Sequence, residues 1–286
     1  MNQNGKILIT GASGKTGSRI AKRLTDLGYA IRTAGRGKSL PNGANEHAIF
    51  DWFDESTHEA ALKDVDKLYL VGPIAVMDPS EIVMPFLERA LKTGVRRIVF
   101  LGSASIPEEG PVFGKIHRAI RELAPEWAVL RPSYFMQNFV DSHGAQILND
   151  GTIVTATGSG RVGFVDADDI AEVGVRALTD KQPHNADHII TGPDSLTYAE
   201  AGEIIGASAG RTIHHVNVPT QELANRFIAF GMPQDYARFL AGMDEDIRLY
   251  GKEDLVTDTV ERITGRPPKS LKKFAEEHAA YWKTAK

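Results

Sequence analysis

Three regularly spaced glycines separate the first apolar segment of the chain from its first amphipathic segment. Residues 6–10 are rich in apolar side chains, and Gly11, Gly14 and Gly17 follow them directly. In such a turn the first glycine permits a tight bend, the second lets other groups approach the backbone, and the third lets a helix pack closely on the preceding strand. The pattern predicts a strand, a tight turn and a helix that open a βαβ unit.

Short apolar runs alternate with amphipathic stretches as far as residue 131. This alternation is typical of a parallel sheet that helices cover on both faces. We therefore expect an α/β fold, a Rossmann-type doubly wound parallel sheet. The expected helices cover residues 16–27 and 79–93, and the expected strands cover residues 6–10, 29–34, 47–50, 67–71, 96–101 and 127–130.

The composition excludes several classes of protein. A net charge of −4 argues against nucleic acid as a partner, because proteins that bind it carry a basic excess. The chain has no cysteine, which rules out disulfides, thiolate metal sites and cysteine nucleophiles. No apolar run reaches the roughly 18 residues that a membrane span needs. We expect a cytoplasmic protein, monomer or homodimer, that binds neither nucleic acid nor membranes.

The glycine turn predicts a site for the pyrophosphate of a nicotinamide dinucleotide. Backbone amides and the partial positive charge of a helix N-terminus attract phosphate. A P-loop fits poorly, because Lys15 and Thr16 lie inside the glycine triplet. The cofactor-binding residues expected in this turn are Gly11, Ser13, Gly14, Lys15, Thr16 and Gly17.

The segment after the second expected strand distinguishes between two cofactors. Chains that bind NAD usually place Asp or Glu there, to bind the ribose 2′-hydroxyl. Here no acid lies between Asp26 and Glu46, whereas Arg36 and Lys38 stand where a 2′-phosphate would lie. A guanidinium can bind phosphate through two hydrogen bonds. The sequence predicts NADP(H), with ordinary surface charge as the alternative for Arg36, Lys38 and Arg32.

Three further expected strands end at the same carboxyl edge of the sheet, where ligands of doubly wound folds bind. Asp51 is expected to accept a hydrogen bond from the adenine amino group, with Trp52 or Phe53 beside the ring. The ends of the fourth and fifth strands are expected to line the ribose and the nicotinamide. These candidates are Val71, Gly72, Pro73 and Ser103. An ordinary turn is the alternative for each of them.

The alternation of strands and helices loosens beyond residue 131. Asp166, Asp168 and Asp169 favour a helix start, because acids stabilise the N-terminal end of a helix. The other elements expected here are strands over residues 152–155, 161–165, 188–190 and 212–218, a helix over 166–178, and mostly helix from residue 197.

The two lobes of the chain are expected to be interleaved, because no Pro- or Gly-rich linker separates them. Residues 1–131 are predicted to form the NAD(P)-binding Rossmann domain, with residues 166–191 returning to it. Residues 132–165 and 192–286 are predicted to form a smaller, mostly helical lobe that binds the substrate.

These features together resemble the NmrA-like branch of the atypical short-chain dehydrogenases/reductases, over nearly the whole chain. Further markers of the resemblance are residues 130–138, 191–193, 197–201 and 264–271. Within the branch, the chain is most similar to the festuclavine dehydrogenase group of ergot alkaloid biosynthesis and its bacterial relatives. The branch also contains quinone reductases, triphenylmethane-dye reductases, and redox-sensing regulators that bind the dinucleotide without turnover. The resemblance implies an oxidoreductase.

The acid–base dyad of ordinary short-chain dehydrogenases is absent from the sequence. Those enzymes carry Tyr-x-x-x-Lys, in which lysine lowers the pKa of the tyrosine. None of the seven tyrosines here has lysine four residues later. Some acceptors need no such acid, because an iminium carbon, a quinone or a cationic dye is already electrophilic. The festuclavine dehydrogenase group is thought to reduce an iminium, which agrees with the missing dyad.

Two residues are the best candidates for a proton donor. Lys115 and His117 lie on the helix expected after the fifth strand, near the place of the missing dyad. Histidine is the commonest acid near neutral pH, whereas a solvated or structural role is the ordinary alternative for both residues. Side chains that could form the wall of a substrate pocket, or simply belong to the core, are Tyr134, Phe135, Met136, Asn138 and Phe164.

No metal site is expected. His214 and His215 are adjacent on an expected strand, so they point to opposite faces, and His184 and His188 lack a third ligand nearby. The sequence therefore predicts an NADPH-dependent reductase of an electrophilic small molecule. The alternative is an NADP(H)-binding redox sensor without turnover, and an epimerase or dehydratase of sugar nucleotides is remote without the dyad.

Overall fold

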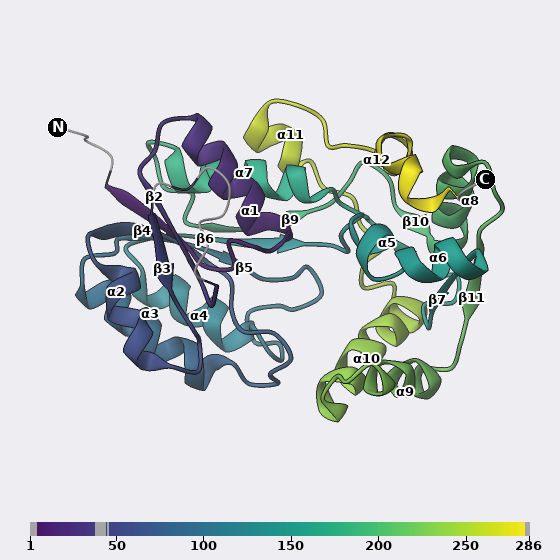
Figure 1. Ribbon diagram of the computed structural model, residues 1–286, viewed down its shortest axis with the longest axis horizontal. Helices are drawn as coiled ribbons and strands as arrows, with labels where there is room; N and C mark the ends of the chain where they lie inside the picture. Colours follow the sequence, from purple (N-terminus) through teal and green to yellow (C-terminus); the bar gives the residue numbers. More distant parts are fainter. Residues whose placement is uncertain (1–4, 38–43, 45, 284–286) are drawn as a thin grey trace. The chain divides into compact units, whose positions relative to one another are not determined.

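A computed structural model describes residues 5–37, 44 and 46–283, and it divides the chain into two compact units (Figure 1). Unit 1 comprises Met1–Arg131 and Ile170–Ile189, and unit 2 comprises Pro132–Asp169 and Ile190–Lys286. The chain therefore passes between the units three times. Lys38, one of the expected phosphate ligands, lies outside the described residues.

A seven-stranded sheet forms the centre of unit 1, in the order β3-β2-β1-β4-β5-β6-β9. The first six strands in this order pair in parallel. The strand order reverses between β1 and β4, which is where ligands bind in doubly wound folds. The strands are β1 (Lys6–Ile9), β2 (Ile31–Gly35), β3 (Glu46–Ile49), β4 (Val65–Leu70), β5 (Arg97–Leu101), β6 (Glu126–Pro132) and β9 (Ala186–Ile190).

Helices cover both faces of this sheet (Figure 1). One face carries α1 (Lys15–Asp26) and α7 (Ala167–Thr179), and the other carries α2 (His58–Leu62), which follows η1 (Glu55–Thr57), with α3 (Ser80–Lys92) and α4 (Gly114–Leu123). The strands are buried on both sides, so that Ile7, Leu8 and Ile9 are fully covered. Each such side chain contributes about 1.5–3 kcal/mol through burial. The continuous apolar strands thus explain the two helical layers.

Unit 2 is built from helices around two short sheets. In one sheet β7 (Thr152–Thr155) pairs in parallel with β11 (His214–Asn217), and in the other β8 (Arg161–Val162) pairs antiparallel with β10 (Leu196–Thr197). The helices are α5 (Asn138–Asp141), α6 (Gly144–Asp150), α8 (Tyr198–Ala209), α9 (Thr220–Ala229), α10 (Gln234–Tyr250), α11 (Thr259–Thr264), α12 (Leu271–His278) and η2 (Ala279–Trp282).

The strand expected over residues 161–165 is shorter than the sequence predicts. It ends at Val162, and Val165 makes only an isolated bridge to Phe135. Beyond Val162 the backbone bonds other segments instead. The Gly163 N–H donates to the Glu253 carbonyl at 3.1 Å, and the Gly163 carbonyl accepts from the Gly192 N–H at 3.3 Å.

The acidic run at the start of α7 has two roles. Asp166 Oδ1 accepts a hydrogen bond from the Asp168 N–H at 2.7 Å, as the helix-start prediction requires. Asp169, which is fully buried, instead accepts from Arg266 Nη1 at 2.6 Å and from the Lys269 N–H at 2.8 Å. The acidic run thus also anchors the segment that precedes α12.

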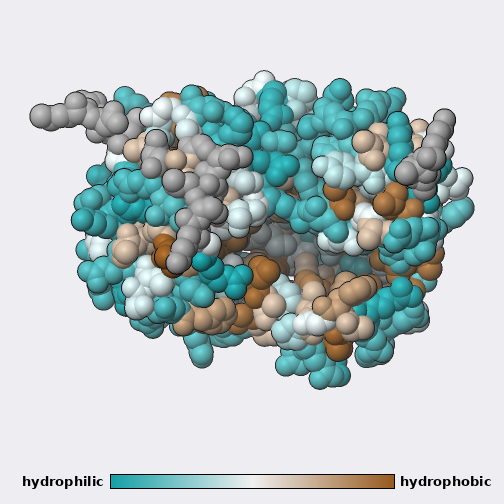
Figure 2. Space-filling view, in the orientation of Figure 1, coloured by the Kyte–Doolittle hydropathy of each residue, from teal (hydrophilic) through white to brown (hydrophobic). Residues whose placement is uncertain are grey.

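On the face that Figure 2 shows, hydrophilic residues predominate and apolar residues lie in small groups. Among the described helices, none combines the length and the apolar character that crossing a membrane requires.

The C-terminal tryptophan is the largest fully buried side chain of unit 2. Trp282 packs near Phe274, and its Nε1 donates to the Phe139 carbonyl at 2.9 Å. We expect Trp282→Ala to lower the free energy of unfolding by about 3–5 kcal/mol, because it leaves a cavity. Trp282→Phe should cost clearly less, since most of the apolar volume remains. Urea unfolding followed by circular dichroism measures both, and equal losses would contradict this account.

Candidate functional site

The glycine turn joins β1 to α1 at the carboxyl edge of the sheet. Gly11 has a φ of +61°, and a Cβ added there would lie 2.9 Å from Val71 Cβ. A Cβ added to Gly17 would lie 2.3 Å from the Gly11 carbonyl oxygen. Both glycines are therefore required by close packing, as the sequence predicts for a turn of this kind.

Gly14 has a different environment, which fits a bound pyrophosphate. It is the N-cap of α1 and provides no side-chain cap, and the first turn of the helix contains no acid. A Cβ added to Gly14 would have only the Gly11 carbonyl oxygen within 4 Å, at 3.1 Å. The first N–H groups of α1 therefore face space that an anion can enter, next to the positive end of the helix dipole.

The side chains around this turn divide into exposed and structural ones. Ser13 is exposed and Lys15 is half-buried. Thr16 is buried, and its Oγ1 accepts a hydrogen bond from the Tyr69 hydroxyl at 2.8 Å. Burial raises the pKa of Tyr69, which therefore stays protonated as a donor. The Thr16 side chain thus holds α1 on β4 and leaves only its backbone for a ligand.

Thr10 holds the ends of β1 and β4 together, a role that the sequence did not indicate. Its Oγ1 accepts from the Val71 N–H at 2.7 Å and donates to the Tyr69 carbonyl at 3.2 Å. The contact depends on the register of two strands that lie far apart in the sequence, so no local pattern predicts it.

The end of β2 presents one arginine and buries another. Arg36 is exposed directly after the strand, and within residues 5–37, 44 and 46–283 no acid pairs with it. Arg32 is buried and pairs with Glu46, its Nη2 lying 2.6 Å from Oε2. Glu46 also pairs with Lys6, and the hydrogen bonds from both cations lower its pKa. Arg32 is therefore structural, and Glu46 is engaged at the start of β3.

The residues after β3 are placed partly in the core. Asp51 Oδ1 accepts from the Phe53 N–H at 3.0 Å. Trp52 packs edge-on against Phe50 and Phe86, with ring centroids 4.9 and 5.2 Å away. Phe53 is 71% exposed, so of the two aromatic candidates it is the freer to lie beside a ligand.

The loops after β4 and β5 complete this edge of unit 1. Val71 contacts Gly11, and Gly72 and Pro73 continue from it along the same edge. Ser103 is half-buried, and its carbonyl accepts from Arg131 Nε at 3.3 Å. Arg131 also pairs with Asp187 at 2.7 Å. The arginine therefore fixes the loop that carries Ser103.

Lys115 is poorly suited to donate a proton. Its side chain is 70% exposed and forms an ion pair with Asp78, which raises the pKa of the lysine. Asp78 also accepts from the Ser80 N–H at the start of α3. A lysine that holds its proton more firmly is a weaker acid. The structure therefore favours a role for Lys115 in joining α4 to the loop before α3.

His117 is the better candidate for proton transfer. It is 5% exposed on α4, and burial lowers its pKa. The charge of Asp187 acts in the opposite direction, while Arg131 lowers the pKa further. The imidazole is therefore mostly neutral at neutral pH.

The five candidate substrate residues all belong to unit 2. Met136 and Phe164 are 1% and 2% exposed within its apolar core, so packing alone accounts for them. Phe135 and Asn138 are half-buried. Tyr134 is half-buried too, and its hydroxyl donates to Asp244 Oδ1 at 3.4 Å.

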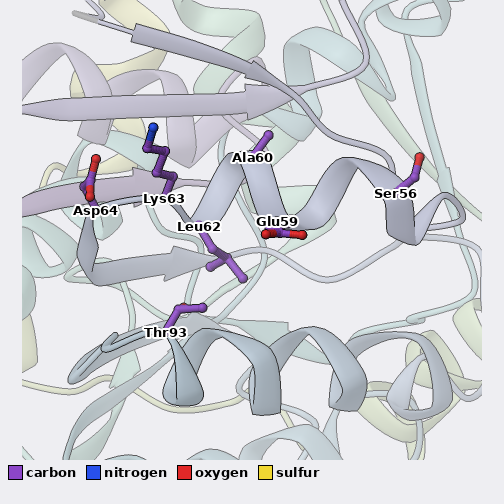
Figure 3. Close-up of a pocket in the computed structure, with 7 residues that line it drawn as sticks. All are labelled: Ser56, Glu59, Ala60, Leu62, Lys63, Asp64 and Thr93. Carbon is purple, nitrogen blue, oxygen red and sulfur yellow. The ribbon is translucent and has the colours of Figure 1, made fainter.

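A surface hollow of about 580 Å³ lies away from this edge (Figure 3). Its lining comes from η1, α2, the turn before β4 and the end of α3. Asp64 immediately precedes β4, whereas Val71 follows it. The hollow therefore lies at the amino end of β4, opposite the end that carries the glycine turn.

The strand order and the glycine turn define a protein of the NAD(P)-binding Rossmann class. The NmrA-like family matches residues 3–276, and the chain belongs to this family. The uncharacterized oxidoreductase YesF of Bacillus subtilis (strain 168) is 52% identical over 283 residues, which cover 99% of this chain and 98% of YesF. The agroclavine dehydrogenase of Claviceps fusiformis is 34% identical over 287 residues, covering 96% of this chain and 98% of that protein.

A solved structure shares the fold at lower identity. The triphenylmethane reductase of Citrobacter sp., complexed with NADP(H), superposes with a TM-score of 0.78 at 22% identity, covering 96% of this chain and 99% of that one. Relatives that match over their full length are named oxidoreductases and dehydrogenases. The chain is an oxidoreductase of the NmrA-like, atypical short-chain dehydrogenase type.

Two glycine substitutions separate folding from binding at the turn. Gly14→Ala should fold normally but weaken dinucleotide binding about tenfold or more, because its methyl group points into the open space beside the helix N-terminus. Gly17→Ala should destabilise the protein by about 1–3 kcal/mol, because its Cβ meets backbone. Calorimetric titration and thermal melting measure the two effects. Gly242→Ala, in α10 with nothing near its added Cβ, is the control; wild-type binding by Gly14→Ala would refute the assignment.

Proposed function

We propose that this protein is an NADPH-dependent reductase that transfers hydride to an electrophilic small molecule. The observation that carries the proposal is the N-terminus of α1, which has no side-chain cap and opens over Gly14. Relatives named oxidoreductase and dehydrogenase, at 52% and 34% identity, support a catalytic use of this site rather than binding alone.

Arg36 supports NADPH as the reduced cofactor. Its guanidinium is exposed at the end of β2, the position that faces the ribose in this fold class. Glu46, the first acid after β2, is engaged by Lys6 and Arg32. A 2′-phosphate would therefore meet a cation, whereas a 2′-hydroxyl would find no free carboxylate among the described residues at that position.

The proposed acceptor is an iminium, a quinone or a cationic dye. When a reduced nicotinamide is bound it supplies one hydride, which converts an iminium into a neutral amine without any added proton. The sequence lacks Tyr-x-x-x-Lys, so an acceptor of this kind suits the chain better than an ordinary carbonyl. A structural neighbour supports this class, since the triphenylmethane reductase of Citrobacter sp. acts on triphenylmethane dyes.

The candidate residues of unit 1 are proposed to bind the cofactor and to transfer a proton. The turn and Arg36 bind the two ends of the phosphate-bearing half, and Ser103 and the residues after β4 are proposed to border the nicotinamide. A quinone needs a proton after it accepts hydride, and His117 is the proposed relay for that proton. The imidazole first takes up a proton from solvent, and its lowered pKa makes the protonated form a stronger acid than an ordinary imidazolium, whereas Lys115 is held by Asp78.

The decisive experiment is NADPH oxidation, followed by absorbance, against a panel of iminium compounds, quinones and triphenylmethane dyes. We expect turnover of at least one acceptor class. Tight NADPH binding without turnover of any of them would contradict the reductase proposal and favour a redox sensor.

Replacing Arg36 tests the cofactor preference separately. Arg36→Ala should weaken NADPH binding about 10- to 100-fold, the usual cost of losing hydrogen bonds to a charged group, and should leave NADH binding nearly unchanged. Arg118→Ala, which removes an exposed arginine from α4, is the matched control. Fluorescence titration gives all the affinities, and an equal loss for both cofactors would remove the 2′-phosphate role.

A further inference from the structure

A carboxylate and two phenols lie together inside unit 2. Asp244, on α10, is 8% exposed, and Tyr198, the first residue of α8, is 3% exposed. Tyr134, which follows β6, donates its hydroxyl toward Asp244. Burial raises the pKa of each tyrosine, and the negative charges of Asp244 and of a second buried carboxylate, Glu253, raise it further.

The charge of Asp244 has little compensation inside the protein. Oδ2 accepts from the Ala156 N–H at 3.0 Å, while Oδ1 has only the Tyr134 hydroxyl, at 3.4 Å. No lysine or arginine of the described chain forms an ion pair with it. Arg248, one turn further along α10, pairs with Glu245 instead. Burying a carboxylate without a cation is costly.

The Tyr198 hydroxyl provides an independent sign of a ligand. It makes no hydrogen bond within the described chain, although the residue is almost completely buried. The hydroxyl is therefore available to a partner from outside the chain.

Aromatic rings surround the same place. Tyr198 packs against Phe139, Phe164 and His143, with ring centroids 5.9, 5.1 and 5.9 Å away. His215 stacks on Tyr198, and its Nε2 lies 2.7 Å from Thr155 Oγ1. Burial lowers the pKa of His143 to about 4 and also lowers that of His215. Both imidazoles are therefore neutral at neutral pH and add no positive charge.

We infer that Asp244 and Tyr198 form a recognition site for an organic cation within unit 2, an assignment that rests on the proposed reductase function. A buried carboxylate without a cation of its own, set among aromatic residues, favours a delocalised or quaternary organic cation. Asp244 supplies the charge, Tyr198 supplies an unpartnered hydroxyl, and Tyr134 orients the carboxylate. Among the acceptors of the proposed reductase, this site selects the positively charged class over neutral quinones.

The test uses the full-length chain, with and without saturating NADP+, and a cation that cannot be reduced. Phenyltrimethylammonium is the probe, and tert-butylbenzene is its neutral isostere. Calorimetric titration at pH 7.5 should show the cation binding at least tenfold more tightly than the isostere. Asp244→Asn should abolish that difference while leaving the affinity for the isostere unchanged, and Tyr198→Phe should weaken cation binding by a few-fold.

Asp246→Asn is the matched control, because it removes the same charge from the same helix. The Asp246 side chain is partly exposed, and its Oδ2 lies 2.6 Å from Lys252 Nζ in an ion pair. Its replacement should leave cation affinity at the wild-type value. Equal affinity for cation and isostere in the wild type, or full cation affinity in Asp244→Asn, would overturn the assignment.

Thermal melting checks that Asp244→Asn folds, and the expected change is opposite in direction. The substitution should weaken cation binding but raise the melting temperature. Burial raises the pKa of Asp244 to about 6, so the folded state disfavours the charged carboxyl. The stability lost to this effect grows as pH rises from the ordinary value near 4 to about 6, and it persists above. Asp244→Asn should therefore melt at a higher temperature than wild type at pH 7.5, with a smaller gain at pH 5. A lower melting temperature at pH 7.5 would contradict the unpaired carboxylate.

Failure of this assignment and failure of the proposed function are distinguishable. Cation binding is measured without turnover, so a chain that binds phenyltrimethylammonium through Asp244 but oxidises no NADPH keeps the cation site and loses the reductase function. A chain that reduces quinones but shows no preference for the cation keeps the reductase function and loses the cation site.

Discussion

The approach of Gly17 to the Gly11 carbonyl is the contact on which the candidate site depends. At the distance that the backbone adopts, no side chain larger than hydrogen fits. This contact sets the helix start directly behind the end of β1, so the first N–H groups of α1, which begins at Lys15, lie at the carboxyl edge of the sheet. The buried strands supply the rigid frame, and the helix dipole supplies the field that favours phosphate.

Most buried charges of the protein have a partner of opposite sign, and Asp244 is an exception. Arg32 is matched by an acid and by carbonyl oxygens, and Asp169 is matched by Arg266. Asp244 is buried with one good hydrogen bond and no ion-pair partner among the described residues. Such an imbalance is a stability cost that natural proteins usually accept only at functional positions. The same reasoning separates Lys115, whose charge is satisfied by Asp78, from groups that are free to act on a ligand.

The candidate residues of unit 1 provide little acid to protonate a reduced acceptor. His117 is buried and mostly neutral, and Lys115 is held in an ion pair. A reductase with so little acid assistance is suited to acceptors that are electrophilic before hydride arrives. Cation recognition by Asp244 would serve the same chemistry, since a carboxylate stabilises the charged acceptor before reduction and releases the neutral product afterwards.

The sequence by itself determined the local features. The glycine turn, the alternating apolar runs and the cation after the second strand come from neighbouring residues, so periodicity and turn chemistry predict the α/β class and Gly11, Gly14 and Gly17. Only the tertiary structure decided which polar and charged side chains remain available to a ligand. Arg32 pairs with Glu46, Lys115 pairs with Asp78, and Thr10 bonds the end of β4, whereas packing within unit 2 brings the charge of Asp244 on α10 near Tyr198 on α8. Such contacts depend on strand register and helix packing over long sequence separations, which a local pattern does not encode.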